Sequence, residues 1–160
     1  MEPLDSVIAA RALLENVTPL KQDCGRICGA ACCQGEEDRI TGMVLFPEEY
    51  QLYPTLPDGW EILPFKVGSR FCQMLVCDGT CDRNMRPLSC RMFPLLPTRK
   101  GAVMDRRGWA ICPLLESGKK GLNPDFNWAV KQAGKLLYAQ DEHAALLDAL
   151  HDYNKQMTIF

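Results

Sequence analysis

The chain has 160 residues, of which 47% are hydrophobic, and its formal net charge is −2 at pH 7. This length suits one domain with a buried core, and the slightly acidic balance argues against a general nucleic-acid-binding protein, which normally carries a basic excess. The chain starts without a recognisable secretory signal, and its apolar runs are too short to span a bilayer. We therefore expect a cytoplasmic protein with no membrane segment.

The N-terminal part of the chain is expected to be helical. Apolar residues recur near one helical face over residues 4–17, and Pro19 should end that helix. A short helix is expected over residues 47–53, because its proline suits a first helical turn. The prolines and the Asp-Gly pair in residues 54–64 then predict a turn-rich connection.

The middle of the chain is expected to contain a small β-hairpin. Its first strand lies over residues 71–76, its turn lies at Asp78-Gly79, and its second strand returns through Cys81. Residues 24–35, which precede it, are rich in glycine and cysteine and indicate a loop.

A proline-rich segment and a second hairpin are expected next. Residues 86–97 contain three prolines and should wrap irregularly. The second hairpin is expected over residues 101–111, with its turn at 106–108 and with Trp109 and Ile111 facing inward.

The C-terminal third differs because its apolar residues follow helical spacing. Asn123-Pro124 is a good N-cap and first-turn pair, and Asp141 is placed to cap a second helix. The apolar positions are Phe126, Ala129, Val130, Ala133, Leu136, Leu137, Ala144, Leu147, Leu150 and Tyr153. We therefore expect a small α+β fold in a single domain over residues 1–160. Terminal helices, including a C-terminal scaffold at 124–156, would pack around a cysteine-rich irregular middle with one or two short β-hairpins.

Cysteine is the outlier of the composition. The chain has nine, and a protein of a reducing compartment rarely holds structural disulfides. The odd count also leaves one thiol over in any complete set of disulfides. Metal or cluster binding is the leading interpretation, ahead of disulfides or redox switching and of inert buried thiols. The candidate metal ligands are Cys24, Cys28, Cys32, Cys33, Cys72, Cys77, Cys81, Cys90 and Cys112.

The spacing of the first cysteines suits thiolate coordination. Cys24, Cys28 and Cys32 have three residues between neighbours, in the range of zinc-ligand pairs, and the adjacent Cys33 would serve another metal or another edge of the same site. Thiolates are soft donors that select zinc, Cu(I) and iron–sulfur centres. The expected cofactor is Zn²⁺ or an iron–sulfur cluster, with 4Fe–4S expected if the metal is iron.

Two arginines bracket one candidate ligand. Four thiolates around Zn²⁺ or a 4Fe–4S core leave a negative centre, and Arg86 and Arg91 on either side of Cys90 are the best-placed charges to offset it. They are therefore candidate cofactor-binding residues, with a solvated arginine surface as the alternative.

The combined pattern resembles a known family. The matching pieces are Cys28-x3-Cys32-Cys33, the segment from Cys72 to Cys81, Arg86-Pro87-x-x-Cys90-Arg91-x-Phe93-Pro94, and Gly42-Met-Val-Leu-Phe46-Pro47-Glu48-Glu49. They are similar to the YkgJ-type cysteine-cluster proteins, the CxxCxxCC family, which are described as zinc- or iron-chelating. The resemblance covers about residues 24–113 and implies that this region binds metal. The chain departs from the family in having three residues between Cys28 and Cys32, and Cys77 is extra to the pattern, which makes it the weakest candidate ligand.

Histidine and methionine offer less specific signals. His143 and His151 are more typical of surface or interface positions than of metal ligands. The methionines that accompany the cysteines are expected to pack in the core, with a mixed-sulfur Cu(I) site as the alternative. They are Met74, Met85, Met92 and Met104.

Three functions remain open at this point. The leading one is a non-catalytic cytoplasmic protein that binds zinc or an iron–sulfur cluster through thiolates. The alternatives are a redox or protein-modification enzyme, or its accessory, that uses an iron–sulfur centre, and a metal-trafficking protein. The expected partners are the metal ion or cluster and, for the latter two functions, another protein, with no nucleic acid and no membrane.

Overall fold

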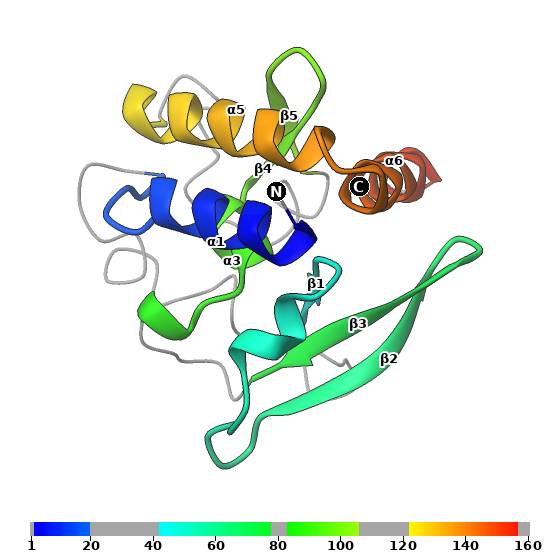
Figure 1. Cartoon of the computed structure of the whole chain (residues 1–160). Helices are drawn as coiled ribbons and strands as arrows, with labels where there is room; N and C mark the ends of the chain where they lie inside the picture. The colour runs from blue at the N-terminus through cyan, green and yellow to red at the C-terminus, as the bar shows by residue number, and fades with distance from the viewer. Residues whose placement is uncertain (1, 20–41, 78–82, 106–121, 157–160) are drawn as a thin grey trace.

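The computed structural model describes residues 2–19, 42–77, 83–105 and 122–156, and the structural statements below concern these ranges. It has the predicted α+β fold, with helices from the two ends of the chain side by side and with small antiparallel sheets (Figure 1). The elements in chain order are α1 (Pro3–Leu13), β1 (Gly42–Leu45), the 3-10 helix η2 (Glu49–Leu52), β2 (Glu61–Val67), β3 (Arg70–Val76), the 3-10 helix η3 (Arg83–Met85), α3 (Leu88–Met92), β4 (Leu95–Pro97), β5 (Ala102–Met104), α5 (Pro124–Tyr138) and α6 (Asp141–Gln156).

The terminal helices confirm the helical spacing of the sequence. Asn123 caps α5 as predicted, because its side-chain oxygen accepts a hydrogen bond from the backbone N–H of Asp125 at 3.1 Å. Asp141 is the first residue of α6. The helix expected over residues 4–17 is shorter, since α1 ends at Leu13, before the poor helix formers Asn16 and Val17.

A three-stranded antiparallel sheet has the order β1-β3-β2. The strand expected over residues 71–76 is confirmed as β3, but its predicted hairpin partner is wrong. Because β2 occupies one side of β3 and β1 the other, β3 has no side left for a returning strand. The hairpin partner is β2, which joins β3 through Gly68 in a left-handed conformation (φ 61°). The predicted turn at 78–79 and Cys81 lie outside the described residues.

Two proline-containing segments form regular elements that their prolines argue against. Residues 54–64 were expected to be a connection, yet β2 begins at Glu61 and contains Pro64, which the edge position of the strand permits. Residues 86–97 were expected to be irregular, yet they contain α3, whose N-cap is Pro87, and β4.

A hairpin is formed by β4 and β5, with Leu95 opposite Met104, so the first part of the hairpin predicted over residues 101–111 is present as the strand β5. Its turn therefore lies at residues 98–101, and the expected turn at 106–108, with Trp109 and Ile111, lies outside the described residues. The short helix expected over residues 47–53 is present as the single turn η2.

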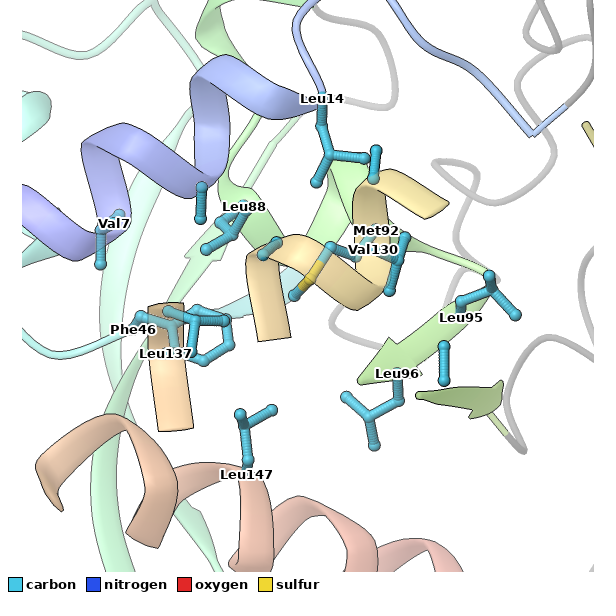
Figure 2. Packing of buried hydrophobic residues seen from close by; sticks show 14 of the residues in the cluster. Val7, Leu14, Phe46, Leu88, Met92, Leu95, Leu96, Val130, Leu137 and Leu147 are labelled. Atoms are coloured by element: carbon cyan, nitrogen blue, oxygen red, sulfur yellow. The ribbon is translucent and has the colours of Figure 1, made fainter. Parts of the chain in front are cut away.

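The main core lies between α1, α3, α5, α6 and the β4–β5 hairpin (Figure 2). Phe126, Val130 and Leu137 of α5 are fully buried in it, as are Leu146 and Leu147 of α6. The other labelled members in Figure 2 are Val7, Leu14, Phe46, Leu88, Met92, Leu95 and Leu96.

A second core lies on the other face of the sheet. Its buried members are Leu45, Tyr53, Trp60 and Leu75. Successive residues of a strand point to opposite faces, so Cys72 of β3 packs against the main core and Leu75, three residues further on, lies in the second core.

A close approach at one glycine sets the distance between α5 and β4. A Cβ atom added to Gly134 would lie 2.7 Å from the Cβ of Pro97, so only glycine allows the helix to pack this near the strand. Within the described ranges, no helix has both the length and the hydrophobicity that crossing a membrane requires.

Candidate functional site

Three of the nine candidate ligands lie among the described residues. Cys72, Cys77 and Cys90 are all half-buried. The other six, Cys24, Cys28, Cys32, Cys33, Cys81 and Cys112, lie outside the described residues. Among the described residues alone, no group of three or more histidine, cysteine, aspartate or glutamate side chains is arranged to hold a metal ion.

Cys72 and Cys77 are directed to opposite sides of the sheet. Cys72 stands opposite Phe65 in the β2–β3 pair, and both pack against the main core. Cys77 follows the last residue of β3 and packs against the second core beside Leu75. Burial raises the pKa of the Cys72 thiol, and the charge of Arg70 opposes this only in part. Burial therefore disfavours the thiolate form of Cys72, whereas Cys77, the weakest candidate by sequence, packs against the same core that contains Tyr53.

Cys90 lies in α3, within range of an electrostatic influence on Tyr53. Burial raises the pKa of Tyr53 to about 12; Arg11 opposes this rise, while Glu49 and Cys90 add to it. Tyr53 is a buried member of the second core, against which Cys77 also packs.

A buried polar cluster lies beside this tyrosine and was not anticipated from the sequence. Glu49 is completely buried, and its carboxylate accepts hydrogen bonds from the backbone N–H of Phe46 (3.0 Å) and of Leu88 (2.8 Å). The guanidinium of Arg11 forms an ion pair with it at 3.1 Å and donates to the Tyr53 hydroxyl at 3.2 Å. Burial raises the pKa of Glu49, while the two N–H groups and Arg11 lower it.

The same cluster holds the backbone that leads to Cys90. Arg11 donates to the carbonyl of Asn84 at 3.2 Å, and the Tyr53 hydroxyl donates to the carbonyl of Met85 at 2.8 Å. Together with the bond from the Leu88 N–H to Glu49, these bonds tie three backbone groups within residues 84–88 to α1, to η2 and to the tyrosine that follows η2. We call this set of contacts the 84–88 clamp.

Arg91, a predicted cofactor-binding residue, belongs to this clamp. Its guanidinium donates to the backbone carbonyls of Arg86 (2.9 Å), Asn84 (3.2 Å) and Arg11 (3.3 Å). Burial and the neighbouring charge of Arg11 lower its pKa. The contacts that the structure gives to Arg91 are therefore structural. Arg86 is half-buried in the same segment, and nothing in the structure tests its expected role at a metal centre.

The histidines and methionines take structural positions. His143, for which a surface or interface position is predicted, is instead fully buried, with Nε2 2.8 Å from the carbonyl oxygen of Pro3 and its ring edge-on to Phe46. His151 is half-buried, with Nε2 2.8 Å from the carbonyl oxygen of Pro97. The methionines pack with the cores: Met74 and Met92 are buried, and Met85 and Met104 pack against core clusters.

The described residues that flank the cysteine-bearing segments lie next to one another in two places. In the β1–β3 pair, Gly42 is opposite Val76, so residue 42, which follows segment 20–41, lies beside the residue that precedes Cys77 and segment 78–82. The backbone N–H of Asn123 donates to the carbonyl of Pro19 at 2.7 Å. Pro19, which precedes segment 20–41, thus contacts a residue that follows segment 106–121, the segment that carries Cys112.

Comparisons of the chain with family models, with curated proteins and with solved structures find no match.

Proposed function

We propose that this protein binds Zn²⁺ or an iron–sulfur cluster through cysteine thiolates drawn from segments that are far apart in sequence, and that it works in the reducing cytoplasm. Nine cysteines confined to residues 24–112 supply the soft donor set that these centres require. The resemblance of residues 24–113 to the YkgJ-type proteins supports the same chemistry. We propose that the protein binds the metal or cluster without catalysing a reaction.

The observation that carries this proposal is the proximity of the segment ends. Six candidate ligands lie in segments 20–41, 78–82 and 106–121. The Gly42–Val76 pairing joins one end of the first segment to the start of the second, and the Asn123–Pro19 hydrogen bond joins its other end to the third. A metal site needs ligands from several segments to converge, and each of these two contacts brings together the described residues that flank two different segments.

The half-buried thiols of Cys77 and Cys90 fit the same proposal. Cys77 packs against the second core and directly precedes segment 78–82, and Cys90 acts electrostatically on Tyr53, a buried member of that core. Cys72 faces the main core instead, packed against Phe65. We therefore propose that Cys77 and Cys90 serve as ligands with cysteines of the neighbouring segments, and that Cys72 is a core residue.

Metal analysis of the protein tests the proposal. The protein is purified without oxygen, its visible spectrum is recorded, and zinc, iron, copper and acid-labile sulfide are quantified. Colourless protein with stoichiometric zinc supports a zinc site, and brown protein with iron and sulfide in near-equal amounts supports a cluster. Protein that carries no stoichiometric metal and does not take any up after reduction would refute the proposal.

A pair of matched variants then tests which thiols take part. Cys77→Ser removes a thiol on the face of the second core, and Cys72→Ser removes one on the face of the main core, five residues away on the same stretch of chain. We expect Cys77→Ser to lower the metal content and Cys72→Ser to leave it at the wild-type level. The reverse result would move the site to the other face of the sheet.

A further inference from the structure

The residues on either side of Cys90 are fixed by contacts to other parts of the chain. The N–H of Leu88 donates to the buried carboxylate of Glu49 at 2.8 Å, and the Ser89 hydroxyl donates to the carbonyl of Val44 in β1 at 2.7 Å. On the other side, Arg91 donates to three backbone carbonyls. Cys90 therefore lies between residues that are tied to η2, β1 and α1.

The backbone before α3 is fixed in the same way. The 84–88 clamp holds the carbonyl of Asn84 through Arg11 and Arg91, and that of Met85 through Tyr53. The bonds from Arg11 and Tyr53 link segments that are 73 and 32 residues apart in sequence. Directional hydrogen bonds of this kind fix the position of a backbone segment more closely than apolar contact does.

The ion pair between Arg11 and Glu49 is costly to bury, and a contribution to fold stability alone does not explain its presence. Replacing a buried ion pair with apolar residues of similar size is often neutral or stabilising. Arg11 and Glu49 therefore give the fold no more stability than apolar residues of similar size would. The ion pair adds directional hydrogen bonds, and these bonds hold the short segment 84–88, which leads to the Cys90 thiol. A metal ligand that is held in place before the metal arrives loses less conformational freedom on binding.

We propose that Glu49 and Arg91 are positioning residues that fix the Cys90 thiol in the geometry for metal coordination before a metal binds. The inference rests on the proposed function, because it assumes that Cys90 is a ligand. Glu49 acts through the first residue of α3 and Arg91 through the backbone of residues 84–86. Neither side chain needs to touch the metal.

Cobalt titration tests this role. Co²⁺ is added to reduced, metal-free protein without oxygen, and the sulfur-to-cobalt charge-transfer band gives the stoichiometry and, by competition with a chelator, the Kd. We expect Glu49→Gln and Arg91→Lys to weaken Co²⁺ binding by about 10-fold or more with unchanged stoichiometry, the effect typical of residues that orient a metal ligand. Asp148→Asn, which removes only the exposed ion pair with Arg99, is the control and should bind as the wild type does.

A second set of variants separates positioning from general stability. If Glu49 acts through Cys90, then Glu49→Gln should have no further effect on the Kd in a Cys90→Ser background, whereas a loss of fold stability would weaken binding in both backgrounds. Tyr53→Phe, which removes only the hydroxyl bonded to the Met85 carbonyl, serves as a milder variant if Glu49→Gln does not fold. Far-UV circular dichroism of each metal-free variant checks the fold.

The outcomes distinguish this inference from the proposed function. Wild-type protein that binds Co²⁺ stoichiometrically, with variants whose Kd values stay within about 2-fold of it, would overturn the positioning role and leave the metal-binding proposal intact. An equal loss in the Cys90→Ser background would do the same. Wild-type protein that binds no metal overturns both.

Discussion

Two buried regions of this protein are held together by different means. The main core around Phe126 and Leu137 is apolar and draws on helices from both ends of the chain. The 84–88 clamp is polar, and its centre is the fully buried carboxylate of Glu49. Apolar burial is non-directional, so the main core fixes how the elements stack. Hydrogen bonds are directional, so the clamp fixes where one backbone segment lies. The difference suggests that stability resides mainly in the first region and ligand geometry in the second.

The largest expected loss of stability comes from the main core. Phe126→Ala should lower the free energy of unfolding by about 3–5 kcal/mol, because it removes a fully buried ring and leaves a cavity. Urea denaturation measures this. Trp128→Ala on the same helix is the control; it is 58% exposed and should change stability by about 0.5 kcal/mol or less. Similar losses for the two variants would show that α5 is not anchored by this core.

Breaking the buried ion pair should have the next largest effect. Arg11→Met leaves the Glu49 carboxylate buried without its cation and should cost about 3 kcal/mol. The double variant with Glu49→Leu should lose less than the sum of the two single variants, because the charge is removed together with its partner. Arg99→Met, at an exposed ion pair, should cost about 1 kcal/mol at most. Strictly additive losses for the first pair would show that the ion pair is not coupled.

The helix–strand contact at Gly134 should give a smaller loss. An alanine there places its Cβ against the rigid ring of Pro97, so Gly134→Ala should cost about 1–3 kcal/mol despite the better helix propensity of alanine. Gly101→Ala is the matched control, because the nearest atom to its added Cβ is the flexible Cε of Lys131 at 3.5 Å. Thermal unfolding of both variants measures the difference, and a stabilised Gly134→Ala protein would contradict the close packing of α5 on β4.

The smallest predicted effect concerns His143, a polar residue buried beside Phe46. Burial lowers the pKa of His143 below its ordinary value of 6.5, opposed by the Pro3 carbonyl, Glu142 and Glu48. The unfolded chain therefore binds more protons than the folded one as pH falls through 6.5, so stability should decrease from pH 7.5 to 5.5. His143→Leu should lose this part of the slope in urea titrations across that range. An unchanged slope would mean that the imidazole titrates alike in the folded and unfolded chains, which contradicts the lowering of its pKa by burial.

Much of the fold could be predicted from local sequence. The helix at α5 follows from apolar spacing and from the Asn123-Pro124 start, both of which are local signals that the structure confirms. Strand β2 was missed because Pro64 counts against a strand, and its acceptance depends on an edge position that only the sheet order reveals. The partner of β3 was missed for a similar reason, since strand pairing is not local.

The candidate site was predictable in its chemistry more than in its geometry. Cysteine content indicates thiolate ligands, but it does not tell which thiols face one another. The alternation of a strand offered a clue, because positions 72 and 77 differ by an odd number and so lie on opposite faces. The role of Glu49 in the clamp could not be read locally: its bond from the Phe46 N–H is local, but its carboxylate is also paired with Arg11, 38 residues away, and with a backbone N–H 39 residues away.

The two meeting points at the segment ends also have a consequence for engineering. Gly42 with Val76, and Pro19 with Asn123, form fixed stems whose positions are set by a sheet pairing and by a backbone hydrogen bond rather than by the sequence between them. Because each pairing joins the flanks of two different segments, a loop put in place of residues 20–41 must reach from Pro19 to Gly42, and one put in place of residues 106–121 must reach from Asp105 to Leu122. Exchanging these segments for other metal-binding loops of that span would test whether the framework of helices and strands serves as a scaffold for transplanted coordination sites.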